Sequence, residues 1–383
     1  MEATVYHVEE GQEIKNLAEQ IARERIAPHA SERDINSEFP RECLRNLGET
    51  GLMGAVISEA HGGSGIGRQV FASIVQELAR GCASTALVYV SHSIVAKALE
   101  LFGSEASKKR WLPGMATAQI LGAFAVHEPD SGCNAGAIRT TAKRDGDFYI
   151  VNGSKIFITS AGEAVIYMIL VRTDPEKGPQ GMSLLILDKD TAGLSFGRPE
   201  DRMGMRSTSS REMFFSDCRV PVQNLVGAEG GMAEIMGKAM MGWGFFGAAA
   251  ISVGIARSAT EIAVTHAKER TISDQPIGVY QAVQSMITDM VLGTESAEAL
   301  LNTCAAKADS SPATAVINGL KAKLFASETA VCVSDKAIQV LGGHGYCRDF
   351  VVERLFRDAR GLTIHFKTSE LLRQDIAKAA LGL

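Results

Sequence analysis

Hydrophobic positions divide the chain into three parts with different periods. In the first part, apolar residues recur every three or four positions, as at Ile14, Leu17 and Ile21, which is the period of an amphipathic helix. From about residue 120 to 227, short apolar runs alternate with polar residues, a pattern typical of β-strands. The helical period returns from residue 231 to the end. The pattern therefore predicts helices, then a β region, then helices.

The middle region also carries the turn signals of antiparallel strands. Asp145-Gly146 and Asn152-Gly153 each lie between apolar runs, and such pairs supply the positive φ angles that tight hairpins need. Long antiparallel helices joined by short loops are expected to form a bundle. The predicted helices of this last part cover residues 235–266, 280–306, 312–341 and 368–381.

These elements predict an α+β protein with three domains. We expect an N-terminal α-helical domain over residues 1–118, a middle β-barrel or β-sandwich domain over 119–228, and a C-terminal four-helix bundle over 229–383. Each part has the size of an ordinary folding unit with its own core.

Composition and charge exclude several classes of protein. Hydrophobic residues make up 46% and charged residues 22% of the chain, which is typical of a globular protein. A net charge of −5 leaves no broad basic surface for nucleic acid. The longest apolar stretch, 245–256, is too short to cross a bilayer, and the N-terminus lacks the features of a signal peptide. We expect a cytoplasmic protein with no nucleic-acid or membrane partner.

The cysteines argue against a metal site and against a disulfide framework. They are odd in number and scattered, include no C-x-x-C pair, and form no His/Cys cluster at metal-ligand spacing. We therefore expect no metal and a reducing compartment. The seven are Cys43, Cys82, Cys133, Cys218, Cys304, Cys332 and Cys347.

Four motifs follow one another along the chain. FAVHEPDSGCN begins at Phe124, NGSKIFITS at Asn152, MGMRS at Met203 and QVLGGHGY at Gln339, with VER, RDAR and IHFKTSE following up to Glu370. In order and spacing they resemble the signature sequences of the acyl-CoA dehydrogenase family, from about Glu13 to the C-terminus. Four ordered matches over the full length are far more specific than any one alone.

This resemblance implies a flavoenzyme that binds FAD and oxidises an acyl thioester, carried on CoA or on an acyl carrier protein, with hydride transfer to flavin N5. The residues that match the family's contacts to FAD within one subunit are Val126, His127, Cys133, Phe157, Thr159, Thr368 and Glu370. Those that match contacts to the FAD of a neighbouring subunit are Arg270, Gln281, Gln339, Gly342 and Gly343. The resemblance thus also implies a homo-oligomer, a tetramer or a dimer, and an electron-transfer flavoprotein as a possible oxidant.

The family's best-known catalytic group is missing. Many members end in I-Y-E-G-T-S-E, where the first Glu removes the α-proton of the substrate; here Phe366 stands at that position. The backbone N–H that binds the thioester oxygen in the family is retained at Phe366. Other members place the Glu on the first bundle helix, but residues 235–260 contain no Asp or Glu.

Three histidines are the candidates for a substitute base. His365 is adjacent to Phe366, although its side chain is expected to point the other way. His92 is expected near the acyl cavity, and His127 near the flavin together with Asp130, both on the side away from the substrate. Each also has a plain structural interpretation, so the sequence leaves the catalytic base unknown.

Several functions remain open at this point. The leading one is an FAD-dependent acyl-CoA dehydrogenase-like oxidoreductase acting on a CH–CH group without the usual base. A variant is a biosynthetic dehydrogenase of hydroxy- or aminoacyl carrier proteins, because a heteroatom helps to expel the hydride and its proton needs only a weak base. The others are a flavin monooxygenase or non-redox flavoprotein on the same fold, and a catalytically silent subunit.

Overall fold

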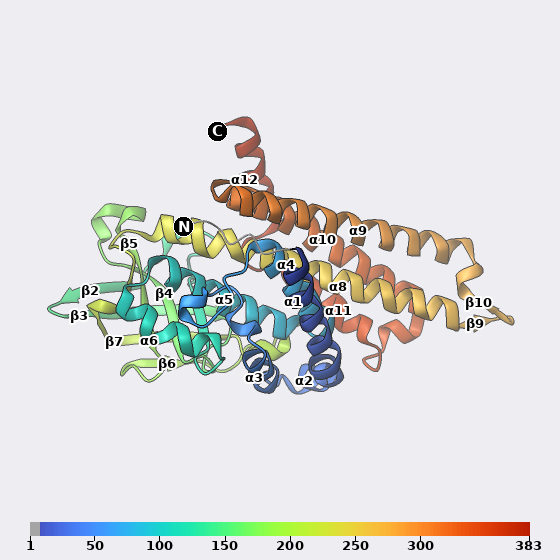
Figure 1. The fold of residues 1–383 in the computed structure, drawn as a ribbon, viewed down its shortest axis with the longest axis horizontal. Helices are drawn as coiled ribbons and strands as arrows, with labels where there is room; N and C mark the ends of the chain where they lie inside the picture. Colours follow the sequence, from blue (N-terminus) through green and yellow to red (C-terminus); the bar gives the residue numbers. More distant parts are fainter. Residues whose placement is uncertain (1–7) are drawn as a thin grey trace.

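The computed structural model describes residues 8–383 and shows the predicted order of helices, sheet and helices (Figure 1). The N-terminal part is helical because its apolar residues line one side of each helix, as in α4, where Phe71, Ile74, Val75 and Leu78 are buried. Its helices are α1 (Val8–Ile21), α2 (Ala30–Asn36), α3 (Arg41–Glu49), α4 (Arg68–Gly81), α5 (Ala83–Phe102) and α6 (Glu105–Ala116), with short η turns between them.

The middle part is one eight-stranded sheet, in the order β6-β7-β3-β2-β4-β5-β8, with β1 parallel to β4. Six of the seven residues of both β4 and β5 are buried, because these strands run through the interior of the fold and are apolar on both faces. The strands are β1 (Gly122–Ala125), β2 (Thr141–Asp145), β3 (Phe148–Ile158), β4 (Ile166–Arg172), β5 (Met182–Asp188), β6 (Leu194–Phe196), β7 (Arg211–Pro221) and β8 (Leu225–Val226).

The C-terminal part is built around one central helix. α8 is buried continuously from Gly242 to Ala256 and packs against α4 and α5 on one side and α9 and α10 on the other. The elements are α7 (Met232–Ile235), the π-helical η9 (Met236–Met241), α8 (Gly242–Glu269), the hairpin β9–β10 (Thr271–Ile272, Gln275–Pro276), α9 (Gln281–Ser310), α10 (Ala315–Leu341), η12 (Gly342–Tyr346), α11 (Val351–Leu362) and α12 (Ser369–Leu381).

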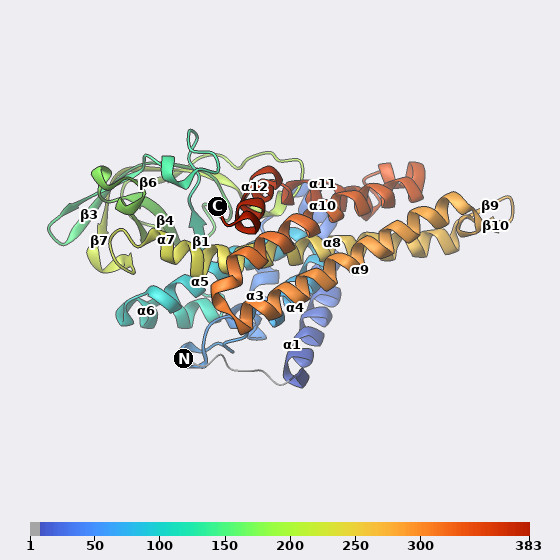
Figure 2. The same ribbon diagram turned by 90° about the horizontal axis from the view of Figure 1, so that it is seen from above.

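The helix α11 was not among the predicted elements. Its twelve residues include Arg354, Arg357 and Asp358, and these charges make the apolar periodicity hard to recognise in the sequence. The helix is nevertheless strongly amphipathic, and Val352, Leu355 and further apolar residues on one face are buried. In both views the sheet lies at one end of the elongated molecule and the β9–β10 hairpin at the other (Figure 1 and Figure 2).

Two helical stretches have the length and composition of a membrane span, which corrects the expectation that no apolar segment is long enough. They are Ala83–Phe102 and Met232–Glu269, and 78% and 94% of their most apolar windows are buried inside the protein. Apolar residues of this kind are expected where a helix is surrounded by other helices, and both stretches are core helices of this fold.

Candidate active site

The predicted flavin contacts fall into two separate groups. Val126, His127 and Cys133 lie in the loop after β1, Phe157 and Thr159 at the end of β3, and Thr368 and Glu370 at the start of α12. The Ile156 N–H donates to the His127 carbonyl at 2.9 Å, which ties the β1 loop to β3, and His365 and Met205 both pack against Gly361, which ties the segment before α12 to the middle part. The second group, Arg270, Gln281, Gln339, Gly342 and Gly343, lies at the hairpin end of the bundle.

One chain does not bring these two groups together. The rings of His266 and His344 are 6.0 Å apart, so the end of α8 and the η12 turn after α10 are neighbours. This end of the bundle lies at the far side of the molecule from the sheet (Figure 2). At Gly342 and Gly343 an added Cβ would meet no atom within 4 Å, so the backbone there is open.

A buried ion pair anchors the loop after β1. Lys155 of β3 is fully buried, and its Nζ donates to Glu128 Oε1 at 2.7 Å and to the Val126 carbonyl at 3.1 Å. Burial lowers the pKa of Lys155 to about 8, so the amine is charged at neutral pH. Burial raises the pKa of Glu128, but Lys155 and the N–H groups of Arg139 and Thr140 outweigh it and hold this pKa below its usual value. The loop therefore has a fixed shape.

The end of β3 is strained and presents an aromatic ring outward. The register between β3 and β7 shifts between Lys155 and Ile158, and Phe157 within this bulge has φ +57°. Its side chain is 60% exposed, and Ser160, three residues on, has φ +63°. Positive φ at residues other than glycine is uncommon and collects at functional sites, so this edge has the features of a ring-stacking surface.

The segment before α12 contains a second strained turn, centred on Phe366. Phe366 has φ +62°, and the Lys367 N–H donates to the His365 carbonyl at 2.7 Å, which closes a three-residue γ-turn. The Phe366 ring packs over α8, where an added Cβ on Gly244 would lie 3.1 Å from the ring. In the described part of the chain the Phe366 N–H has no hydrogen-bond acceptor.

Buried polar atoms without partners gather in the same segments. Nine such side-chain atoms occur in residues 10–383, and five of them belong to residue 160 and the segments 202–207 and 365–369. Natural proteins pair nearly all buried polar groups, so this cluster marks a surface that a polar ligand completes. The five atoms are Ser160 Oγ, Arg202 Nε, Ser207 Oγ, His365 Nδ1 and Ser369 Oγ. Together with the exposed Phe157 ring, they fit a flavin cofactor.

The contacts of His92 and His365 are with residues other than Phe366. His92 is fully buried in α5, its Nδ1 is 3.3 Å from the Gly122 N–H, and burial lowers its pKa to about 4. His365 packs on Gly361, where an added Cβ would be 3.3 Å from its ring, whereas Phe366 turns toward Gly244. Burial, with the charges of Arg202, Lys323 and His127, lowers the pKa of His365 to about 4 as well.

The other two candidates lie in the β1 loop. Burial lowers the pKa of His127, and the charge of Lys155 adds to this effect. Asp130 is exposed and its Oδ2 is 3.2 Å from Arg139 Nη1. Imidazoles with depressed pKa values are neutral at pH 7 but hold a proton weakly. The described geometry therefore leaves the catalytic base unassigned.

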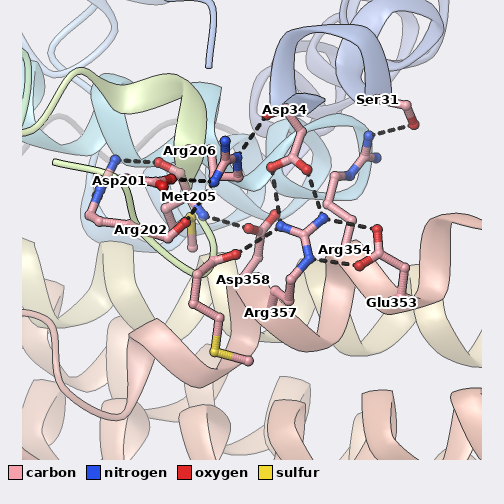
Figure 3. Close-up of polar contacts among 11 residues, drawn as sticks. Ser31, Asp34, Asp201, Arg202, Met205, Arg206, Glu353, Arg354, Arg357 and Asp358 are labelled. Atoms are coloured by element: carbon pink, nitrogen blue, oxygen red, sulfur yellow. Dashed lines mark hydrogen bonds and ion pairs between the residues drawn. The ribbon is translucent and has the colours of Figure 1, made fainter. Parts of the chain in front are cut away.

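A dense polar cluster at the junction of the three parts was not foreseen from the sequence (Figure 3). Arg357 of α11 donates to Asp34 of α2 at 2.7 Å, to Glu353 at 2.6 Å and to the Met203 carbonyl at 2.9 Å. The Met205 N–H donates to Asp358 at 2.6 Å, and burial raises the pKa of Asp358 to about 6. The motifs MGMRS and RDAR therefore meet each other.

The cluster fixes the frame of the turn at Phe366. Gly204 lies so close to α11 that an added Cβ would be 2.4 Å from the Arg357 carbonyl oxygen. Met205, which has φ +52°, is buried beside Gly361, against which His365 packs. The loop 201–206 thus supports the segment that leads from α11 into the turn. A cavity of about 340 Å³ opens beside this cluster.

Comparison with known proteins agrees with this architecture. The N-terminal, middle and C-terminal domain models of acyl-CoA dehydrogenase match residues 8–119, 123–218 and 229–381. A cyclohex-1-ene-1-carbonyl-CoA dehydrogenase of Geobacter metallireducens is 37% identical over 378 residues, 98% of this chain and 99% of that protein.

Two solved structures illustrate the similarity in three dimensions. Butyryl-CoA dehydrogenase of Megasphaera elsdenii superposes with a TM-score of 0.93 at 33% identity, over 97% of this chain and 98% of that one. The prolyl acyl carrier protein oxidase AnaB gives a TM-score of 0.93 at 28% identity, over 99% of this chain and all of that one. The predicted fold class is thereby confirmed, and the chain belongs to the acyl-CoA dehydrogenase family.

Proposed function

We propose that this protein is an FAD-dependent dehydrogenase whose substrate is an acyl thioester with a hydroxyl or amino group on the acyl chain, presented by CoA or an acyl carrier protein. Family membership supports the dehydrogenase class, the oxidation of acyl thioesters and the use of FAD. The observation that carries the finer proposal is the Phe366 turn, which keeps a free N–H but has an apolar ring where a carboxylate is expected.

The residues around the strained segments are the ones that would hold the cofactor. Phe157 offers its exposed ring to the flavin, and Thr159 and Thr368 offer hydroxyl donors from either side. When bound, FAD supplies the acceptor for a hydride. The apolar Phe366 ring and the buried α8 helix form an apolar wall on this side of the turn.

The free N–H of Phe366 is suited to bind the thioester oxygen. A fixed backbone donor stabilises negative charge that develops there during reaction. With no carboxylate at residue 366, a C–H proton next to the thioester has no acceptor in the turn. Where the substrate carries a hydroxyl or amino group, hydride leaves to the flavin from the carbon that bears the heteroatom and a C=O or C=N⁺ bond forms. The proton on that oxygen or iminium nitrogen is acidic enough to pass to water without a positioned carboxylate. The prolyl acyl carrier protein for which AnaB is named has such a nitrogen.

A second copy of the chain would complete the cofactor site. The second group of predicted flavin contacts cannot reach the first group within one chain, because the two lie at opposite ends of the molecule (Figure 2). This second group is Arg270, Gln281, Gln339, Gly342 and Gly343. Arg270 and the open backbone of the glycines suit the diphosphate of a cofactor held by a neighbouring copy. We propose a homo-oligomer, a tetramer or a dimer, in the cytoplasm, with an electron-transfer flavoprotein as oxidant.

Anaerobic titration of the purified flavoprotein tests this function. Two sets of thioesters are compared, simple acyl-CoAs and hydroxy- or aminoacyl carrier proteins, and the visible flavin band is followed. Bleaching by the second set alone is the expected result. Bleaching by simple acyl-CoAs would overturn the heteroatom proposal, and a flavin that neither set reduces would favour a non-redox flavoprotein or a silent subunit.

A further inference from the structure

We infer that Lys323 is a positioning residue for the thioester: it holds the turn at Phe366 in the one shape that points the free N–H of Phe366 toward the substrate oxygen. The inference deepens the proposed function and rests on it. Lys323 belongs to none of the four motifs, and it reaches the turn from the middle of α10.

Lys323 is a buried ammonium group with an unusual set of partners. Its side chain is 0% exposed, and its Nζ donates to the backbone carbonyl of Lys367 at 2.7 Å. No carboxylate lies within ion-pair distance of it in residues 10–383. A buried charge without a partner of opposite sign is costly, and an apolar residue would fill the same space at less cost. The hydrogen bond to the turn therefore explains why a lysine occupies this buried position.

Burial also affects the charge of this group. It lowers the pKa of Lys323 to about 8, and the charges of Glu328 and Glu370 act in the opposite direction. At neutral pH the amine therefore remains an ammonium, whose hydrogen bond to a carbonyl is stronger than that of a neutral donor.

The turn needs support because its backbone is strained. Phe366 has φ +62°, a conformation that bulky side chains rarely adopt, and nothing in its own side chain favours it. Contacts hold it on several sides. Lys323 binds the Lys367 carbonyl, the Lys367 side chain pairs with Asp375 of α12, and the Phe366 ring rests on Gly244.

The free N–H follows from this shape. In the γ-turn the hydrogen bond is made by Lys367 N–H to the His365 carbonyl, which leaves the N–H between them unused. Without Lys323 the partly buried Lys367 carbonyl would lose this hydrogen bond, and the turn would relax toward a negative φ that rotates the Phe366 N–H. Since residue 366 has no carboxylate, the N–H is the polar contact that the turn can offer to the thioester.

The experiment measures polarisation of the thioester rather than turnover. The FAD-loaded protein binds a non-oxidisable 3-thiaacyl thioester with ¹³C in its carbonyl group, on CoA and on a carrier protein, and isotope-edited infrared spectra give the carbonyl frequency. Wild type is expected to shift the band to lower frequency. The shift should fall in the order wild type, Lys323→Gln, Lys323→Met, because Gln keeps a shorter, uncharged donor and Met keeps none. Probe affinity should fall about tenfold in Lys323→Met.

The matched control is Lys321→Met, on the same helix but exposed, which should behave like wild type. FAD content and the unfolding temperature are measured for each variant. If Lys323→Met does not fold, the carbonyl shifts of wild type and Lys323→Gln are compared instead. An equal shift in wild type and either variant, or in the two variants, overturns the inference while leaving the proposed function intact. A wild type that shifts neither probe overturns both.

Discussion

The junction around Asp358 and the turn around Phe366 lie eight positions apart on the chain and differ in almost every respect. At the junction Arg357 pairs with Asp34, Glu353 and the Met203 carbonyl, and Asp358 accepts from the Met205 N–H. At the turn the backbone is strained, the N–H of Phe366 is free and His365 Nδ1 is buried without a partner. A satisfied network fixes the frame, and unsatisfied groups on that frame mark where a ligand binds.

The largest expected effect comes from placing a carboxylate in the turn. Phe366→Glu keeps the backbone N–H and puts an acceptor beside a C–H proton, and general-base catalysis is worth about 10² to 10⁴ in rate. We expect reduction of the flavin by simple acyl-CoAs to accelerate by that range in anaerobic stopped-flow experiments. Ile364→Glu, at a 55% exposed position two residues earlier, is the control and should give no gain. No acceleration in Phe366→Glu would show that the turn does not face the α-carbon.

Breaking the junction should affect stability far more than breaking a surface ion pair. Arg357→Met leaves the buried Asp34 and the partly buried Glu353 without their partner, and breaking a buried pair costs about 3 to 5 kcal/mol of unfolding free energy. Arg373→Met removes an exposed pair with Glu328 and should cost less than about 1 kcal/mol. Urea unfolding of both variants measures the difference. Equal losses of unfolding free energy in the two variants would mean that the junction contributes no more than a surface ion pair.

The pH dependence of stability distinguishes Asp358 from ordinary carboxylates. Its pKa of about 6 in the folded protein lies above the ordinary 3.8, so the folded state holds the proton more tightly than the unfolded state. Ionisation therefore costs stability, and wild type should lose up to about 3 kcal/mol relative to Asp358→Asn as pH rises from 4 to 7. Urea unfolding across this range tests the sign. A relative gain for wild type with rising pH would refute it.

The smallest effect concerns the packing beneath the turn. Gly244→Ala gains about 1 kcal/mol from helix propensity but puts a Cβ 3.1 Å from the Phe366 ring, which must move. We expect the substitution to stabilise a Phe366→Ala background by about 1 kcal/mol and to give no gain in wild type. Unfolding of the four proteins in this cycle measures the coupling. An equal gain in both backgrounds would show that the ring does not rest on Gly244.

Residue types alone give the composition of the turn but not its shape. The absence of a carboxylate at residue 366 and in residues 235–260 can be read from residue types alone, and the motifs identified the family and the fold. The positive φ of Phe366 could not be predicted, because an aromatic residue does not favour it; contacts from α10 and α12 impose it.

The junction escaped prediction for another reason. Arg357 meets Asp34 from 323 positions away, and Asp358 meets Met205 from 153 positions away. No local period links such pairs, and charged residues on an amphipathic helix are usually solvated. The glycine in MGMRS and the Arg-Asp pair in RDAR were the only signals, and their link appears only when the fold places Gly204 against the backbone of α11.

The hydrogen bonds that shape the Phe366 turn all use backbone groups or neighbouring side chains, and none uses the side chain of residue 366 itself. The hydrogen bonds of the turn therefore do not depend on the chemistry of its central side chain. Such a position lets evolution exchange a proton acceptor for an aromatic ring without rebuilding the scaffold. For protein engineers, residue 366 is accordingly a place where one substitution can give this fold a new reaction.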